Sequence, residues 1–161
     1  MPDNDLPVLA QKVLETLRQS GRRLVTVESC TGGLISATLS DLPGSSEVLE
    51  GSFVTYSNDL KTSAVGVPET ILRLFGAVSL QTAEAMARGG LSHALNADLA
   101  LSVTGIAGPG GGTISKPVGT VCFALASRSG LAISVQKHFM GDRQTVRRLS
   151  VREALLMVLE S

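Results

Sequence analysis

Apolar residues recur at helical spacing in the first twenty residues of the chain. A helix over about 6–19 would gather five of them on one side, because positions three and four apart share a helix face: Leu6, Leu9, Val13, Leu14 and Leu17. Ser20-Gly21 then ends the helix, since Gly is favoured just past a helix C-terminus. The pattern predicts an amphipathic helix with its apolar side toward a core.

Further helices are predicted in the middle of the chain. Residues 34–40 follow a Thr-Gly-Gly turn, and the chain turns helical again after Lys61, with Pro68 suited to the first helical position before 69–75. A longer helix runs from near Ser79 to about 95 and carries an apolar stripe. Gly89 and Gly90 lie inside it at a cost of about 1 kcal/mol each relative to Ala, so we expect close packing there.

Short runs rich in β-branched residues predict five strands. They cover residues 24–27, 48–56, 98–106, 118–126 and 131–139. A tight polar link over 127–130 joins the last two strands, so we expect an antiparallel hairpin.

The last helix begins after Asp142, a favourable N-cap residue. Its apolar positions follow the i, i+3, i+4, i+7, i+8 pattern of a core face: Val151, Ala154, Leu155, Val158 and Leu159. The order of helices and strands predicts a single α/β domain over 1–161, with a mixed sheet and helices on its faces.

Composition narrows the class of protein. Hydrophobic residues make up 43% and charged residues 17%, enough for a substantial core. Fourteen basic residues balance fourteen acidic ones, which argues against a general nucleic-acid binder. No apolar run approaches the roughly 20 residues of a membrane span. The first eleven residues lack the basic-then-apolar layout of a signal peptide, so we expect a cytoplasmic protein.

Two cysteines, Cys30 and Cys122, are too few for a disulfide framework or a zinc site. His93 falls in a helix and His138 near a strand end, both away from any motif. We interpret the two histidines as structural or surface residues and expect neither a metal nor a cofactor.

Three polar clusters stand where strands end, and open α/β sheets usually bind ligands at such ends. The first is ESCTGG at 28–33, which places Ser29 at a strand-to-helix turn. Backbone N–H groups at the helix start could hold an anion or a developing oxyanion. A plain capping serine followed by turn glycines would give the same pattern.

The second cluster is YSNDLK at 56–61, and the third is TGIAGPGGGT at 104–113, continuing to Lys116. A lysine next to a serine can act as its general base if burial lowers the lysine pKa, although most lysines are solvated surface charges. The glycines of the third cluster would let backbone N–H groups approach a ligand. A flexible hairpin-type loop is the alternative, and the GK[ST] of a P-loop is missing.

Two arginines stand out at the start of the last helix. Four-residue steps backward from Val151 reach Arg147 and then Arg143, on the buried line of a helix N-terminus that disfavours cations. We therefore expect an anionic partner for them. Glu28 or a ligand phosphate would serve, and the phosphate is the preferred interpretation.

Taken together, these motifs resemble the CinA C-terminal domain family, the nicotinamide-nucleotide amidases. The matching segments are ESCTGG at 28–33, YSNDLK at 56–61, TGIAGPGGGT with KPVGTV over 104–121, and FMGDRQTVR at 139–147. The resemblance spans residues 28–147, and this chain is similar to the stand-alone form of the family. The family fold is a compact three-layer α/β/α structure.

The resemblance implies hydrolysis of the carboxamide of nicotinamide mononucleotide to nicotinate mononucleotide and ammonia, with no metal. Ser29 matches the nucleophile, Lys61 the general base, Tyr56 a supporting catalytic residue and Arg143 a further active-site residue. Cys30 is interpreted as tolerated rather than catalytic. Eight further residues are expected to contact the substrate: Thr31, Gly32, Gly33, Asn58, Thr104, Gly105, Gly108 and Arg147.

Two other functions fit the same residues. One is a binding module associated with competence or DNA repair that has lost turnover, and the other is a hydrolase of a different small amide or ester. The set of Ser29, Tyr56, Lys61 and Arg143 favours the enzyme, because a scaffold has no need of it. The expected partners are a small nucleotide substrate and further copies of the chain, as a homo-oligomer with a dimer favoured.

Overall fold

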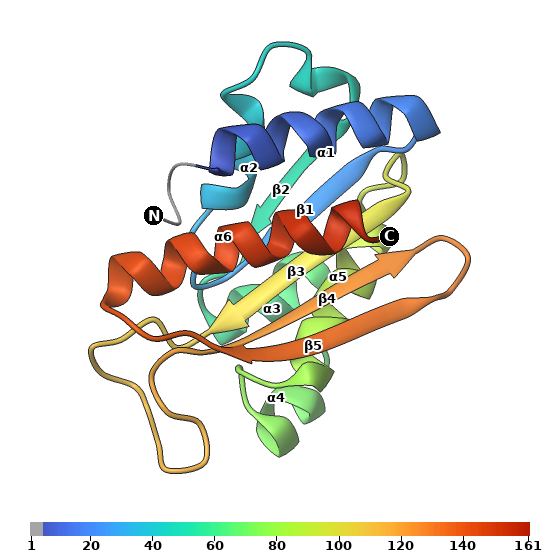
Figure 1. Ribbon diagram of the computed structural model, residues 1–161. Helices are drawn as coiled ribbons and strands as arrows, with labels where there is room; N and C mark the ends of the chain where they lie inside the picture. Colours follow the sequence, from blue (N-terminus) through green and yellow to red (C-terminus); the bar gives the residue numbers. More distant parts are fainter. Residues whose placement is uncertain (1–4) are drawn as a thin grey trace.

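A five-stranded mixed sheet forms the centre of the molecule over residues 5–161, which the computed structural model describes (Figure 1). Residues 1–4 lie outside the described residues. They include the start of the eleven-residue stretch whose layout differs from that of a signal peptide. The strand order is β2-β1-β3-β4-β5. The strands are β1 (Leu24–Glu28), β2 (Leu49–Val54), β3 (Leu99–Gly105), β4 (Thr120–Ser127) and β5 (Ala132–His138).

Strand β4 runs opposite to the other four strands of the sheet. Strand β1 pairs in parallel with both β2 and β3, whereas β3–β4 and β4–β5 are antiparallel pairs. The predicted hairpin between the last two strands is therefore confirmed. All five predicted strands form, with ends that differ from the predicted bounds by one or two residues.

Helices cover both faces of the sheet (Figure 1). One face carries α1 (Leu6–Ser20), α2 (Leu34–Ser40) and α6 (Arg143–Leu159), and the other carries α3 (Asn58–Val65), α4 (Glu69–Phe75) and α5 (Leu80–His93). A short 3-10 helix, η1 (Ser45–Glu47), precedes β2. This arrangement confirms the predicted three-layer α/β/α fold with a mixed sheet.

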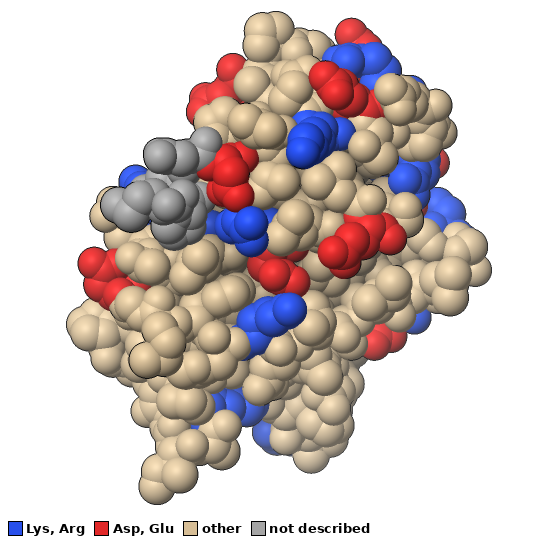
Figure 2. Space-filling model, in the orientation of Figure 1, with Lys and Arg blue, Asp and Glu red and all other residues tan. Residues whose placement is uncertain are grey.

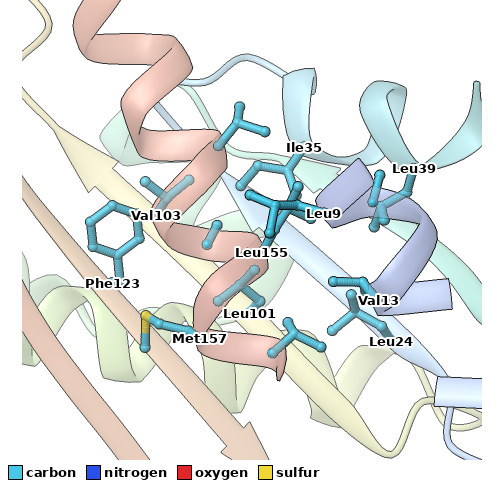
Figure 3. Packing of buried hydrophobic residues seen from close by; sticks show 14 of the residues in the cluster. Leu9, Val13, Leu24, Ile35, Leu39, Leu101, Val103, Phe123, Leu155 and Met157 are labelled. Carbon is cyan, nitrogen blue, oxygen red and sulfur yellow. The ribbon is translucent and has the colours of Figure 1, made fainter. Parts of the chain in front are cut away.

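The larger core lies between the sheet and the α1, α2 and α6 layer. Figure 3 shows Leu155 of α6 between the strand residue Val103 and the α1 residue Leu9, with Met157 of α6 beside Phe123. Aliphatic side chains supply most of this core, with Phe123 and Phe139 meeting edge to face at its margin. Burial of these side chains fixes α6, and with it the arginines at its first turns.

Small residues let α5 approach the opposite face closely. A Cβ atom at Gly89 would collide with the backbone carbonyl of Val65 in α3, and one at Gly90 would lie 2.6 Å from Val27 Cγ2. The close packing expected at these two glycines is thus observed. It places α3, and therefore Lys61, directly against α5.

Two predicted helix starts are wrong by a few residues. Helix α3 begins at Asn58, before Lys61 rather than after it, because the Ser57 hydroxyl caps it by accepting a hydrogen bond from the Leu60 N–H. Pro68 is the N-cap of α4 and not its first helical residue. The first of these differences puts Lys61 in a helix, which gives its side chain a fixed direction.

The expected buried line of arginines on α6 is also wrong. Arg143 is exposed and Arg147 half-buried, while Val146 and Ser150 occupy the buried positions. A step of four residues turns a helix by about 400°, so each such step moves the side chain about 40° away from the buried face. Two steps carry Arg143 to the edge of the sheet.

The surface carries a mixture of charges. Figure 2 shows acidic and basic side chains interspersed on the face that bears α1 and α6. Within residues 5–161, no helix is long and apolar enough to cross a membrane.

Candidate active site

The ends of three parallel strands meet at one edge of the sheet. Since β1 runs parallel to both β2 and β3, their carboxyl ends bring the first, second and third polar clusters together. A pocket of about 210 Å³ lies there. Seven of the predicted site residues line it: Ser29, Tyr56, Asn58, Lys61, Thr104, Gly105 and Arg143.

Ser29 and Lys61 are in direct contact within this pocket. Ser29 follows the last residue of β1, and its N–H donates to the Val103 carbonyl of β3 at 3.0 Å. Lys61 Nζ lies 3.1 Å from Ser29 Oγ and 3.4 Å from the Tyr56 carbonyl oxygen. Only 8% of Ser29 and 1% of Lys61 are exposed, so the hydroxyl and the amine meet away from bulk water.

The surroundings of Lys61 favour its neutral form. Burial lowers the pKa of the Lys61 amine from the ordinary lysine value of 10.5. Its two hydrogen-bond partners are the hydroxyl of Ser29 and the carbonyl of Tyr56, neither of which carries a charge. A neutral amine beside a hydroxyl can accept the proton of that hydroxyl, as a general base must.

Arg143 joins two of the clusters from the start of α6. Its Nη1 donates to the Gly108 carbonyl at 2.7 Å and its Nη2 to the Tyr56 hydroxyl at 2.9 Å. No carboxylate of the described residues pairs with it. The guanidinium therefore lies at the pocket with its charge unbalanced by the protein, which suits an anionic group of a ligand.

Glu28 does not provide the anionic partner expected for the arginines. Its carboxylate accepts hydrogen bonds from the Ile35 and Ser36 N–H groups at 2.9 and 3.0 Å. The Gly32 N–H, in turn, donates to the Ser29 carbonyl at 3.0 Å. These amides at the start of α2 are thus occupied by the protein itself and are not open to a ligand anion.

Arg147 lies behind the nucleophile turn. Its Nε donates to the Cys30 carbonyl at 3.1 Å and its Nη2 to the Thr31 carbonyl at 3.0 Å. Arg147 is absent from the pocket lining, as are four other predicted contact residues: Thr31, Gly32, Gly33 and Gly108. Contact of these five residues with a substrate stays a prediction.

Two backbone N–H groups at the pocket are candidates to hold an oxyanion. Cys30 and Ala107 line the pocket, and no backbone or side-chain group of another described residue accepts a hydrogen bond from either N–H. Cys30 follows Ser29 directly in the chain, and its N–H contacts its own thiol. An oxyanion site built from backbone N–H groups needs no charged residue.

Three small residues of the pocket were not predicted as contact residues from the sequence: Ala77, Val78 and Ala107. Ala77 and Val78 stand before Ser79, the N-cap of α5, and the Thr104 hydroxyl donates to the Ala77 carbonyl at 2.7 Å. The only signal in the sequence was their position beside a helix start. Ala107 belongs to the glycine-rich cluster at 104–113, but it was not among the predicted contact residues.

The cysteines and histidines carry no catalytic arrangement. Burial raises the pKa of Cys30 to about 12 and that of Cys122 to about 11, which keeps both thiols protonated. His93 and His138 contact the backbone carbonyls of Gly89 and Val118. Among residues 5–161, no three His, Cys, Asp or Glu side chains gather in a way that could hold a metal ion.

Solved structures of other proteins share this fold. The crystal structure of the competence/damage inducible protein CihA from Agrobacterium tumefaciens superposes with a TM-score of 0.94 at 43% identity, over 97% of this chain and 94% of that one. The nicotinamide-nucleotide amidohydrolase PncC of Escherichia coli is 45% identical over 155 residues, which are 96% of this chain and 93% of the relative.

Some relatives are much longer than this chain. A relative from Caldicellulosiruptor bescii is 45% identical over 151 residues, and the chain spans only 36% of its length. The family model described as the CinA C-terminal domain matches residues 7–161. A match over nearly the whole chain, together with relatives of equal extent, shows that the chain belongs to the CinA C-terminal domain family.

Proposed function

We propose that the chain is a nicotinamide-nucleotide amidohydrolase, which converts nicotinamide mononucleotide to nicotinate mononucleotide and ammonia. The observation that carries the proposal is the buried contact between Ser29 Oγ and Lys61 Nζ at 3.1 Å. The PncC relative of Escherichia coli, named for this activity, matches 96% of the chain.

The reaction begins with neutral Lys61. As Ser29 Oγ attacks the carboxamide carbon, its proton passes to Lys61 Nζ, and the carbonyl oxygen becomes an oxyanion held by the Cys30 and Ala107 N–H groups. Lys61 then returns the proton to the departing nitrogen, and the C–N bond breaks to release ammonia. The product of this half-reaction is an ester between Ser29 and the nicotinoyl group.

Hydrolysis of the ester repeats the same proton movements. Lys61 takes a proton from water, and the resulting hydroxide attacks the ester carbon. The ester bond breaks, the proton returns to Ser29 Oγ, and nicotinate mononucleotide leaves. Each half-reaction starts and ends with a neutral amine at Lys61, so one base serves both.

Arg143 and Tyr56 are proposed to position the substrate. A guanidinium can hold the phosphate of the nucleotide through two parallel hydrogen bonds. The Arg143 guanidinium already donates a hydrogen bond to the Tyr56 hydroxyl. The same guanidinium would bind the phosphate. Asn58, Thr104 and Gly105 line the pocket beside the Ser29–Lys61 pair and are proposed to contact the carboxamide and the ring.

Ammonia release from a panel of amides tests the activity. We expect release from nicotinamide mononucleotide by the wild-type protein and none by the Ser29→Ala variant. Faster release from another amide would make the chain a hydrolase of that compound. Nucleotide binding without release from any amide would instead support the binding module.

The predicted assembly and location remain separate proposals. We propose a cytoplasmic homo-oligomer, with a dimer favoured. Sedimentation equilibrium of the purified protein measures the first, and fractionation of the cells that produce it measures the second. A mass of 16.7 kDa at all concentrations would contradict the oligomer.

A further inference from the structure

Glu28 is a buried acidic side chain next to Ser29 in sequence but outside the pocket lining, and the proposed reaction does not use it. Among the described residues, the only charged side-chain types that are fully buried are Glu28 and Lys61. Lys61 has a role as the base. Glu28 precedes the nucleophile by one residue, at the end of β1.

The Glu28 carboxylate is surrounded by hydrogen-bond donors. Oε1 lies 2.8 Å from the Thr31 hydroxyl and 2.9 Å from the Ile35 N–H, and Oε2 lies 3.0 Å from the Ser36 N–H. Two further hydroxyls approach Oε2 from the sheet, that of Thr26 in β1 at 2.9 Å and that of Ser52 in β2 at 3.2 Å. One carboxylate thereby connects β1, β2, the nucleophile turn and the first turn of α2.

This connection determines where Ser29 stands. The turn over 29–33 leaves β1 and enters α2, and the Glu28 carboxylate accepts hydrogen bonds from Thr31 within the turn and from the first turn of α2. Arg147 holds the Cys30 and Thr31 carbonyls of the same turn from α6. Lys61 comes from α3, so the distance between Lys61 Nζ and Ser29 Oγ depends on how firmly the turn is fixed.

We propose that Glu28 is a positioning residue for catalysis, whose carboxylate holds the turn so that Ser29 Oγ stays within hydrogen-bond distance of Lys61 Nζ. This inference rests on the proposed function, because it concerns the same nucleophile and base. Small displacements of a nucleophile greatly reduce the rate, since attack requires close and aligned atoms.

The negative charge of Glu28 is essential to this role. Two backbone N–H groups point at the carboxylate from the start of α2, where the helix dipole favours an anion. A glutamine at this position would turn its own NH₂ group toward one of these donors. The turn would remain attached through Arg147, so the variant should fold with Ser29 displaced.

Glu28→Gln tests the proposal, with Ile35→Val as the matched control. Ile35 is fully buried in the same first turn of α2, and its N–H still reaches Glu28 when one methyl group is removed. Steady-state kinetics with nicotinamide mononucleotide and a crystal structure of the Glu28→Gln variant are the two measurements. Both kinetic comparisons are made well below the unfolding temperature of each protein.

We expect kcat of Glu28→Gln to fall more than fivefold at nearly unchanged KM, while Ile35→Val stays within twofold of the wild type. A smaller fall in kcat, or a loss carried by KM alone, would overturn the proposal and leave Glu28 a structural cap. A wild-type protein without activity would instead remove the proposed function. The structure of the variant then decides: a Lys61 Nζ–Ser29 Oγ distance beyond 3.5 Å supports positioning, and an unchanged one overturns it.

Discussion

Lys61 Nζ lies 3.1 Å from Ser29 Oγ although 32 positions separate the two residues in sequence. The contact forms because β1 and β2 are parallel neighbours, so the turn after β1 and the helix after β2 begin side by side. Packing of α5 against α3 fixes the helix that carries the lysine. The arrangement of two neighbouring strand ends thus brings the proposed nucleophile and its proposed base together.

Ser29→Ala should abolish turnover while the protein stays folded. The hydroxyl is the proposed nucleophile, and loss of such a group lowers kcat by at least about 10³-fold. Alanine fits the space of serine, so the circular dichroism spectrum and the melting temperature should change little. Ammonia release from nicotinamide mononucleotide measures the loss.

The neighbouring Cys30→Ala variant is the control for Ser29. Burial keeps the Cys30 thiol protonated, so we expect this variant to retain most of its activity. An inactive but folded Cys30→Ala protein, beside an active Ser29→Ala protein, would point to a thiol mechanism.

Activity should rise with pH through the lowered pKa of Lys61. Only the neutral amine accepts the serine proton, and burial shifts the pKa below 10.5, so the neutral fraction grows at lower pH than for a solvated lysine. A pH profile of kcat/KM measures this. Lys61→Arg should be inactive throughout, because a guanidinium stays protonated, and an active Lys61→Arg protein would remove Lys61 from the mechanism.

Lys61→Met should be inactive yet at least as stable as the wild type. Between the lowered pKa and 10.5, the unfolded chain binds more protons at Lys61 than the folded one does. Wild-type stability therefore gains from this group as pH rises across that interval, whereas Lys61→Met lacks the gain. Denaturant unfolding at several pH values should show the stability advantage of the variant narrowing as pH rises.

Arg143→Ala should weaken use of the nucleotide far more than it weakens the fold. Loss of a charge-assisted contact costs about 1.5–3 kcal/mol, or roughly 10- to 100-fold in kcat/KM. Arg143 is exposed and pairs with no described carboxylate, so stability should change by no more than about 0.5 kcal/mol. Lysine at this position should restore activity only in part.

The nucleoside that lacks the phosphate is the matched control for Arg143. If the guanidinium binds the phosphate, wild type and Arg143→Ala should hydrolyse this nucleoside with similar kcat/KM. A large drop in melting temperature with unchanged nucleotide kinetics would show that Arg143 only braces α6.

Gly89→Ala should destabilise the protein, because its Cβ would collide with the Val65 carbonyl. Overpacking of this kind costs about 1–3 kcal/mol. Gly110→Ala is the control, since no atom lies within 4 Å of a Cβ there and its backbone φ suits alanine. Thermal unfolding compares the two, and equal melting temperatures would contradict tight α3–α5 packing.

Most of the fold follows from local patterns in the sequence. Apolar spacing located α1, α5 and α6, and β-branched runs located the strands, since each pattern reflects one buried face. The start of α3 was missed because the segment after β2 is polar, and only the Ser57 cap marks the helix. Strand order depends on contacts between distant segments, which periodicity does not encode.

Seven of the residues that line the pocket were predicted from the sequence, but the contacts among the site residues were not. Ser29, Tyr56, Lys61 and Arg143 do gather at one pocket. The partners of Glu28 and Arg147 could not be assigned, because hydrogen bonds to backbone groups leave no residue signature. Glu28 was one of two expected anionic partners for the arginines, whereas its carboxylate accepts hydrogen bonds from N–H groups at the start of α2.

Arg143 is exposed to solvent, whereas Ser29 and Lys61 are buried. The steps that depend on Arg143 should therefore respond to ionic strength differently from those that depend on the Ser29–Lys61 pair. Mobile ions screen exposed charges over about 10 Å at 0.1 M salt and about 3 Å at 1 M, but they scarcely reach buried groups. Added salt should therefore raise KM through exposed Arg143 and leave kcat, set at the buried Ser29–Lys61 pair, nearly constant. Nucleotide capture would then vary with the salt content of the cell, while the speed of amide cleavage would not.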